Sequence, residues 1–148
     1  MEREVATRSA EETEQLGREL AAELSHSDVV YLVGELGAGK TTLARGLAAG
    51  LGAVARQVAS PSFALLHEYA NPEGEVVLRH LDLYRLEDRT TELAILSLPE
   101  EAAGAPIAVE WPRSAIRELL PPTYEIAIRE AETGGRRITL RRSKASGG

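Results

Sequence analysis

Residues 34–41 constrain the fold of this chain more than any other part of the sequence. They read Gly-Glu-Leu-Gly-Ala-Gly-Lys-Thr and match the phosphate-binding pattern G-x-x-x-x-G-K-[ST]. In such a loop, backbone N–H groups curl around phosphate oxygens at the positive end of a helix. Gly37 and Gly39 permit the curl, because a side chain there would crowd the phosphate or forbid the backbone angles. We expect Lys40 to bridge the terminal phosphates and the Thr41 hydroxyl to ligate magnesium.

The segments on either side of the loop have the patterns of a strand and a helix. Residues 28–33 form a short apolar run rich in β-branched side chains, which is typical of a strand buried on both faces. Residues 42–49 predict a helix with Leu43 and Leu47 on one face, ended by the glycines at 50 and 52. This is the context that the motif requires.

The composition supports the loop and limits the range of functions. Among the 17 Lys and Arg residues only Lys40 and Lys144 are lysines, and a compact ammonium fits between phosphates in a tight loop where a planar guanidinium does not. With 148 residues and a net charge of -6, we expect one domain that does not bind DNA and that works on RNA only through partners. The absence of cysteine excludes disulfides, thiolate metal sites and a cysteine nucleophile. Because the sequence has no long apolar run, we expect a cytoplasmic protein without membrane contact.

The rest of the chain alternates between helix and strand patterns. A capping box at Ser9 and Glu12 and leucines at 16, 20 and 24 predict an amphipathic helix over residues 10–24. The other predicted elements are strands at 64–69 and 75–81 around a turn at 71–74, a helix at 87–96, a turn or helix at 99–103, a buried strand at 106–110, a short helix at 116–120, and a hairpin of 124–129 with 137–141. Together they predict an α/β fold of the P-loop NTPase type, with three layers (α/β/α) around a mixed parallel and antiparallel sheet. We expect residues 1–142 to form one domain and residues 143–148 a disordered tail.

Two acids end apolar runs and are candidates for a magnesium site. Asp82 follows the run 76–81, and Glu110 follows the run 107–109. A phosphate-binding loop needs a carboxylate at the end of a neighbouring strand to hold magnesium or its water ligands. Each acid could instead cap the turn after its strand. The sequence leaves open which of the two would contact the metal.

Several other side chains are candidates for a function or for a purely structural role. Residues 60–62, Ser-Pro-Ser, occupy the place of a hydroxyl that senses magnesium or phosphate in switch proteins, or form only a rigid turn. His80 is a candidate base, although a packed or capped histidine is commoner at a strand end. Trp111 could cover a nucleotide, face a partner or pack in the core. The basic end, Arg136, Arg137, Arg141, Arg142 and Lys144, is interpreted as a solvated edge strand.

Four motifs, in their order and spacing, resemble the TsaE (YjeE) family of small bacterial ATPases. They are residues 34–42, residues 60–63, residues 80–86 (His-Leu-Asp-Leu-Tyr-Arg-Leu) and residues 109–112 (Val-Glu-Trp-Pro). The resemblance implies an ATPase that acts with TsaB and TsaD in forming the threonylcarbamoyl group on adenosine next to the anticodon, in tRNAs reading ANN codons. It also implies that TsaD performs the transfer and that ATP hydrolysis by the small protein resets the complex, so that tRNA is contacted only indirectly.

The same resemblance assigns the site residues. Lys40, Asp82 and Glu110 are the expected catalytic residues, and Thr41, Asp82 and Glu110 the expected magnesium ligands. The expected ATP-binding residues are Glu35, Leu36, Gly37, Ala38, Gly39, Lys40, Thr41, Thr42 and Ser62. The family usually has threonine at the position of Ser62, and its usual Glu-Leu-Gly segment is replaced here at residues 91–94 by Thr-Glu-Leu-Ala.

Two alternatives to this function remain open from sequence. A small-molecule kinase also uses such a loop, although residues 86–105 are few for both a lid and an acceptor pocket. A nucleotide-gated binding module would use the same residues with only slow hydrolysis. GTP is disfavoured as the nucleotide because the chain lacks the Asn-Lys-x-Asp guanine signature.

Overall fold

The computed structural model describes residues 2–35, 37–58, 65–84, 104–112 and 114–143. Several sequence predictions lie outside these ranges. They concern Leu36, Ser62, the helix at 87–96, the turn or helix at 99–103, and all but the first residue of the predicted tail.

The described residues form an eight-stranded sheet with the order β1-β8-β7-β2-β6-β5-β4-β3. Its strands are β1 (Glu2–Thr7), β2 (Val29–Val33), β3 (Ala55–Val58), β4 (Leu65–Ala70), β5 (Val76–Asp82), β6 (Ile107–Glu110), β7 (Tyr124–Glu130) and β8 (Arg136–Arg142). The central strands β7, β2, β6 and β5 are mutually parallel, and the outer pairs are antiparallel. This confirms the predicted α/β class with a mixed sheet.

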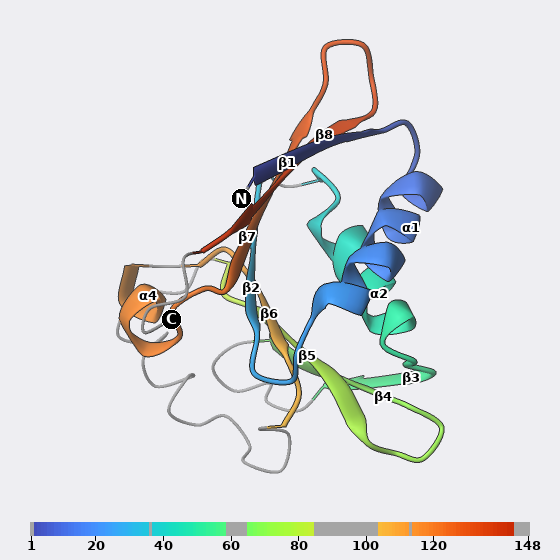
Figure 1. The fold of residues 1–148 in the computed structure, drawn as a ribbon, viewed down its shortest axis with the longest axis vertical. Helices are drawn as coiled ribbons and strands as arrows, with labels where there is room; N and C mark the ends of the chain where they lie inside the picture. Colours follow the sequence, from blue (N-terminus) through green and yellow to red (C-terminus); the bar gives the residue numbers. More distant parts are fainter. Residues whose placement is uncertain (1, 36, 59–64, 85–103, 113, 144–148) are drawn as a thin grey trace.

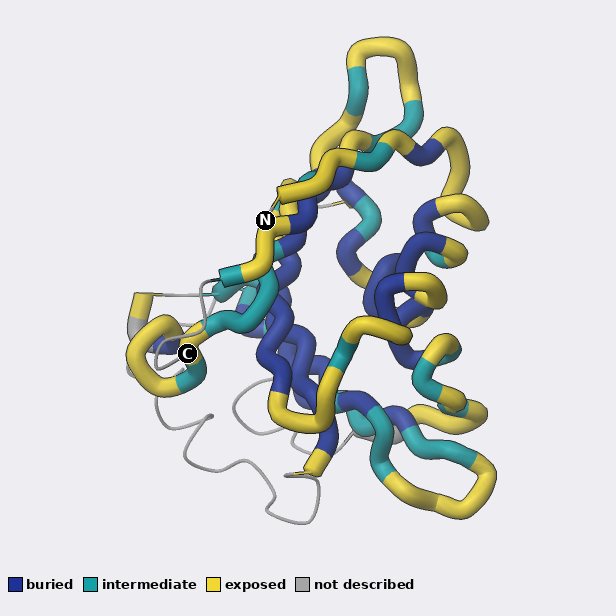
Figure 2. The backbone as a smooth tube through the Cα atoms, in the orientation of Figure 1, coloured by how far each residue is buried: buried dark blue, intermediate teal, exposed yellow. Residues whose placement is uncertain are grey.

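Helices cover both faces of the sheet (Figure 1). On one face lie α1 (Ala10–Leu20), a 3-10 turn η1 (Ala21–Glu23) and α2 (Lys40–Gly50), and on the other lies α4 (Ser114–Leu119). The side chains of β2 alternate accordingly, because successive residues of a strand point to opposite faces: Val30 and Leu32 pack toward α1 and α2, whereas Val29 and Tyr31 share a core with Ile116 of α4. Figure 2 shows this central strand region as the buried part of the fold. Within the described ranges, no helix is long and apolar enough to cross a bilayer.

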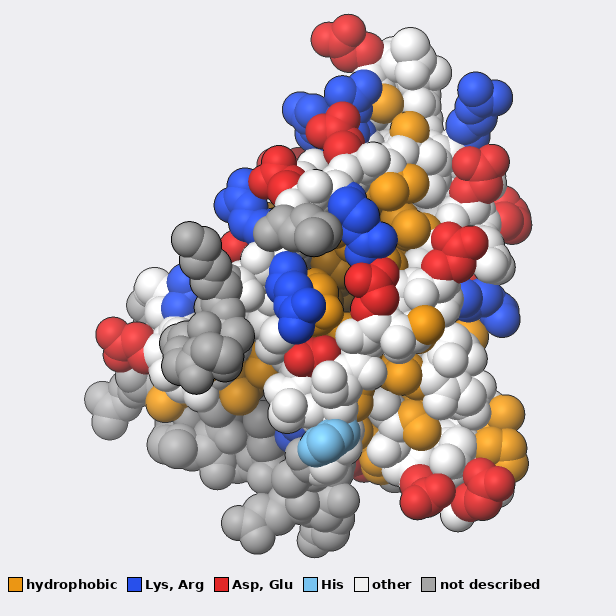
Figure 3. All heavy atoms as spheres, viewed as in Figure 1, with side chains coloured by type: hydrophobic (Ala, Val, Ile, Leu, Met, Phe, Trp, Pro, Cys, Tyr) orange, Lys and Arg blue, Asp and Glu red, His pale blue; other side chains and the backbone are white. Residues whose placement is uncertain are grey.

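Strands β1 and β3 were not predicted from the sequence, and the interpretation of β8 as an edge strand was wrong. Three of the six residues of β1 are charged (Glu-Arg-Glu-Val-Ala-Thr), and β3 has only four residues (Ala-Arg-Gln-Val). Neither strand therefore shows an apolar strand pattern. Because β1 is the edge strand and pairs with β8, β8 is not the solvated edge that its arginines suggested. Ion pairs join Arg137 to Glu4 and Arg141 to Glu2, and Figure 3 shows such acidic and basic side chains next to each other at the upper left. Opposite charges on facing strands stabilise the pairing.

Close backbone packing joins α1 and α2, the two helices on one face of the sheet. A Cβ added to Gly46 would lie 2.1 Å from the Glu14 carbonyl oxygen, and one added to Gly17 would lie 2.5 Å from that of Leu43. No larger residue fits at either glycine unless a helix moves.

The predicted helix over 10–24 is α-helical only to Leu20 and continues as the 3-10 turn.

Replacing Tyr31 with phenylalanine is expected to reduce the loss of stability at alkaline pH. Burial raises the pKa of Tyr31 from 10.0 to about 12, although the charge of Arg117 opposes the shift. The unfolded chain therefore ionises at a lower pH than the folded chain, so the stability that this group contributes is complete below pH 10 and is lost as the pH rises through 10 toward 12. Between pH 9 and 11 this amounts to about 1.4 kcal/mol.

Urea unfolding of the wild type and of Tyr31→Phe at pH 9, 10 and 11 measures this difference. The variant is expected to be less stable at neutral pH, because it lacks the hydrogen bond that the Tyr31 hydroxyl donates to the Leu120 carbonyl at 2.6 Å. Its stability should nevertheless fall less steeply with pH than that of the wild type. Parallel curves would contradict the assignment of the alkaline loss to Tyr31.

Candidate functional site

The loop between β2 and α2 has the backbone that phosphate binding requires. Gly37 and Gly39 have φ values of +79° and +114°, a region that residues with side chains rarely adopt. Gly39 is the N-cap residue of α2 and has no side chain that could cap the first turn. The N–H groups of this turn therefore face the loop, at the positive end of the helix dipole.

Lys40 lies inside the loop and is covered by an aromatic ring. Its Nζ donates to the Gly34 carbonyl at 2.5 Å and lies 3.5 Å from the centroid of the Trp111 ring. Trp111 has a φ of +57°, which is strained for a bulky residue and occurs directly after β6. Its ring also contacts that of Tyr84, with centroids 4.9 Å apart. Of the three possibilities for Trp111, the structure favours a cover over the loop.

The two predicted acids end neighbouring strands next to the loop. Asp82 of β5 and Glu110 of β6 are register partners in a parallel pair, so both lie at the same edge of the sheet. The Thr41 hydroxyl donates to Glu110 Oε2 at 3.3 Å, and Asp82 Oδ1 accepts a hydrogen bond from the Tyr84 backbone at 2.9 Å. Asp82 thus also caps the turn after its strand. Together with Gly37, Gly39, Lys40, Thr41, Thr42, Tyr84 and Trp111, the acids line a hollow of about 270 Å³.

A buried histidine holds the Glu110 carboxylate. His80 Nε2 and Glu110 Oε2 are 2.5 Å apart, and the two side chains are 4% and 6% exposed. A packed or capped histidine was favoured over a base from sequence, and this contact shows His80 packed against the acid itself. Its other ring nitrogen, Nδ1, has no hydrogen-bond partner among the described residues.

Burial and neighbouring charges shift the pKa values of two residues in the hollow. Burial alone would raise the pKa of Glu110, but the hydrogen bond and charge of His80, the charge of Lys40 and the Thr41 hydroxyl together hold it below its ordinary value of 4.5. Burial lowers the pKa of Lys40 from 10.5, although Glu110, Asp82 and Glu35 oppose the shift. Glu110 is therefore ionised at neutral pH beside an incompletely solvated ammonium.

Arg136 belongs to this site, although its sequence pattern indicated only a solvated edge strand. It lies at the beginning of β8, and its guanidinium donates from Nε to the Ala38 carbonyl at 2.8 Å and from Nη2 to the Gly37 carbonyl at 3.2 Å. These bonds hold the outer side of the loop in place. The same side has a second hollow, of about 220 Å³, lined by Ser9, Ala10, Thr13, Gly37, Ala38, Gly39, Thr42, Gly135 and Arg136.

The remaining predicted residues divide into two groups. Glu35, Ala38 and Thr42 lie in or beside the loop as expected, whereas Leu36 and Ser62 lie outside the described residues. Among the residues that the structure describes, no group of three or more His, Asp or Glu side chains could hold a metal unaided. Protein carboxylates alone thus do not form a metal cage in this part of the chain.

Comparison with known proteins gives the family. The model of the family described as "Threonylcarbamoyl adenosine biosynthesis protein TsaE" matches residues 7–138. The chain belongs to the TsaE family. The resemblance drawn from the four sequence motifs is thereby confirmed.

Individual TsaE relatives agree with the family match over most of the chain. The protein named "tRNA threonylcarbamoyladenosine biosynthesis protein TsaE" of Bacillus subtilis is 38% identical over 135 residues, which cover 90% of this chain and 82% of that protein. The protein of the same name from Streptomyces coelicolor is 40% identical over 117 residues, covering 79% and 78%. A crystal structure of Bacillus subtilis YdiB superposes with a TM-score of 0.71 at 30% identity and covers 99% of this chain and 88% of that one.

Proposed function

We propose that this TsaE family member is a magnesium-dependent ATPase that acts in tRNA threonylcarbamoyladenosine biosynthesis together with TsaB and TsaD. The observation that carries the proposal is the hollow beside the loop, in which Lys40, Thr41 and the two strand-end acids meet. A kinase would need an acceptor site as well, and nothing in this hollow favours one.

The residues of the loop fit a triphosphate. The backbone N–H groups of Gly39 and of the first turn of α2 would bind phosphate oxygens, whereas the Ala38 N–H donates to the Glu35 carbonyl at 3.1 Å. Lys40 holds its ammonium at the Gly34 carbonyl and against Trp111, and it would exchange these contacts for oxygens of the terminal phosphates. Arg136 keeps the loop carbonyls at 37 and 38 occupied, so that the amides face the ligand.

The donor groups near Thr41 fit a magnesium ion. Magnesium in phosphate sites takes one or two protein oxygens and completes its shell with phosphate and water, so the lack of a three-acid cage among the described residues does not argue against it. The Thr41 hydroxyl and the Asp82 carboxylate would hold it, and Glu110 would bind a water beside it. When bound, magnesium neutralises charge on the phosphates.

Glu110 is positioned to orient the attacking water. It is ionised and buried, and its Oε2 is held by both His80 and Thr41, so its carboxylate presents a defined acceptor at the hollow. A fixed acceptor of this kind would orient water and take up its proton as the water oxygen bonds to the terminal phosphorus and the bond from that phosphorus to the ADP oxygen breaks, so that ADP leaves. Asp82, which is half-buried and bonded to the Tyr84 backbone, would hold the metal or its water ligands.

The proposed cellular function is the resetting of a TsaB–TsaD complex in the cytoplasm. The net charge of -6 argues that tRNA is bound by the partners and not by this chain. A nucleotide-dependent change at the loop would alter contact with the partners, as in other switch proteins.

Association and hydrolysis measured together test this function. The purified protein is expected to hydrolyse Mg·ATP slowly alone and faster with TsaB and TsaD, and its capture by TsaB and TsaD should depend on ATP. Absence of hydrolysis in both settings, or absence of association with the pair, would reject the proposal.

A further inference from the structure

A hollow of about 500 Å³ lies on the α1–α2 side of the sheet, away from the nucleotide loop. Its lining residues are Glu14, Arg45, Ala48, Ala49, Ala53, Val54, Ala55, Arg56 and Tyr69. None of them lines the hollow around Lys40 and Glu110. The hollow has no part in the proposed ATPase chemistry.

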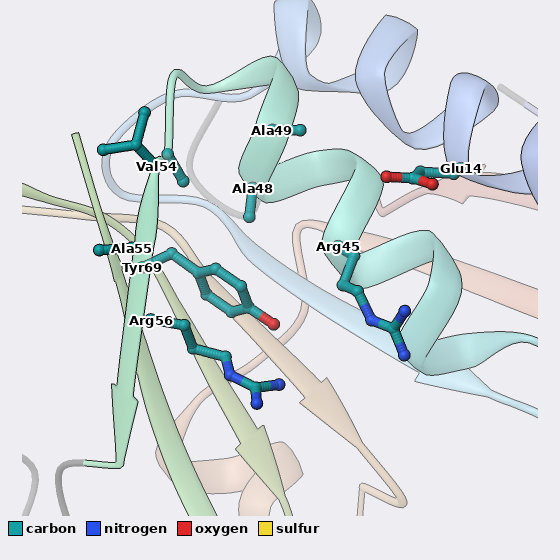
Figure 4. Close-up of a pocket in the computed structure, with 9 residues that line it drawn as sticks. Glu14, Arg45, Ala48, Ala49, Val54, Ala55, Arg56 and Tyr69 are labelled. Carbon is teal, nitrogen blue, oxygen red and sulfur yellow. The ribbon is translucent and has the colours of Figure 1, made fainter. Parts of the chain in front are cut away.

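Three hydrogen-bond donors converge in this hollow (Figure 4). Tyr69 extends from β4 toward α2, and its hydroxyl lies between the guanidinium groups of Arg45 and Arg56 in that view. Arg56 and Tyr69 are register partners on adjacent strands, so their side chains lie on the same face of the sheet. The hollow therefore presents two cations and a hydroxyl to one ligand.

None of the three donors is satisfied within the described part of the chain. Tyr69 is 6% exposed, and its hydroxyl oxygen is buried without a hydrogen-bond partner there. A buried hydroxyl without a partner is costly. The exposed side chains of Arg45 and Arg56 form no ion pair with described residues, whereas Arg3, Arg137 and Arg141 are each paired with a glutamate. Two guanidinium groups and a hydroxyl, all without a hydrogen-bond acceptor among the described residues, are complementary to a carboxylate.

The rest of the lining distinguishes among anions. Glu14, which pairs with Arg18 at 3.6 Å, lies on the opposite side of the hollow from Arg56 (Figure 4). Its negative charge disfavours the several closely spaced charges of a nucleic-acid backbone more than a single carboxylate bound near Arg56. The alanines at 48, 49, 53 and 55 and Val54, which is 69% exposed, form an apolar wall. A polypeptide segment with an acidic residue next to an apolar one matches both the cationic side chains and the apolar wall of the hollow.

The hollow also adjoins an exposed strand edge. Ala55 and Arg56 belong to β3, the last strand in the sheet order, whose outer side pairs with no strand of the described sheet. Extended peptides bind such edges through their backbone. We propose that the hollow docks an extended acidic segment of a partner protein, whose carboxylate binds Arg45, Arg56 and Tyr69 and whose neighbouring apolar side chain packs on the alanine wall.

An array of heptapeptides tests the proposal. The peptides are acetylated and amidated, carry Glu, Asp, Gln or Asn at the centre, and have random flanking residues. The full chain is expected to select Glu or Asp with an apolar neighbour, and the selected peptide should bind at least tenfold more tightly than its Gln or Asn counterpart. Equal binding of acid and amide peptides would overturn the proposal.

Variants assign the binding to this hollow. Arg45→Glu and Arg56→Glu should each weaken binding of the selected peptide at least tenfold, and Tyr69→Phe about threefold. The matched control is Arg129→Glu at the end of β7, which makes the same charge change on an exposed residue and should leave peptide binding unchanged. If the control weakens binding as much as the two hollow variants do, the hollow is not the site.

Two further measurements exclude other occupants and keep the test separate from the ATPase proposal. A 12-nucleotide RNA or inorganic phosphate that competes with the peptide would indicate a phosphate site and overturn the proposal. A dimer in sedimentation that Arg45→Glu or Arg56→Glu converts to monomer would assign the hollow to a second copy and also overturn it. All variants should retain wild-type binding of Mg·ATP, since none of these residues lines the loop hollow.

Discussion

Replacing Lys40 with alanine is expected to weaken Mg·ATP binding at least 100-fold. Lys40 is 4% exposed and its ammonium lies within the loop, where its hydrogen bonds to phosphate would be charge-assisted. Such bonds contribute about 1.5–3 kcal/mol each, and two of them correspond to roughly two to four powers of ten in the dissociation constant. Arginine at position 40 should not restore binding, because a planar guanidinium does not fit where the ammonium donates to the Gly34 carbonyl.

Calorimetry and tryptophan fluorescence measure this effect independently. Trp111 is the only tryptophan of the chain, and its ring lies 3.5 Å from Lys40 Nζ, so a nucleotide that draws the ammonium away should change its emission. Lys144→Ala, which removes the same charge from the other lysine of the chain, is the control and should bind as the wild type does. Binding by Lys40→Ala within threefold of the wild type would refute the nucleotide site.

The features predicted correctly, namely the loop, its flanking elements and the strand-end acids, depend on residues that are close in sequence. The loop, its glycines and the flanking β2 and α2 follow from residues adjacent in sequence, since the backbone angles at 37 and 39 need glycine. Asp82 and Glu110 were predicted because each ends an apolar run and a phosphate-binding loop needs a carboxylate at the end of a neighbouring strand. The register of β5 with β6 confirms that the two acids are neighbours.

Contacts between distant segments could not be read from the sequence. Arg136 reaches the Ala38 carbonyl across 98 positions of sequence, and no local pattern separates it from the charged residues of a surface strand. The same limit applies to β1, whose charges are explained only by pairing with β8. The bond between His80 and Glu110 likewise depends on strand order, because β5 and β6 are 25 positions apart along the chain, from Asp82 to Ile107.

Replacing Glu110 with glutamine is expected to lower the rate of ATP hydrolysis at least 100-fold while changing Mg·ATP affinity less than tenfold. General-base catalysis contributes about 10²–10⁴ in rate, and an amide cannot accept the proton of the water. Glutamine keeps the size of the side chain and an oxygen that accepts from Thr41, and Lys40 and the loop amides are unchanged. The rate is measured in a single turnover and the affinity by Trp111 fluorescence.

Two further variants define the cause of the loss. Glu125→Gln removes a carboxylate that pairs with Arg117 outside the hollow and should hydrolyse ATP at the wild-type rate. Asp82→Asn should weaken the dependence on magnesium more than Glu110→Gln does, if Asp82 holds the metal and Glu110 the water. If Glu110→Gln instead weakens the magnesium dependence more than Asp82→Asn does, Glu110 holds the metal and Asp82 the water. An unchanged hydrolysis rate in Glu110→Gln would show that Glu110 has no part in catalysis.

Glu110→Gln also separates an ATPase that resets a complex from a module that only needs bound nucleotide. If hydrolysis resets TsaB and TsaD, the variant should support about one round of threonylcarbamoyl transfer per complex and then stop, because bound ATP cannot be cleared. The amount of modified tRNA, measured against the amount of complex, gives this number directly. Sustained multiple turnover with a variant that binds ATP but does not hydrolyse it would mean that nucleotide binding alone is sufficient, and the ATPase proposal would give way to the nucleotide-gated module.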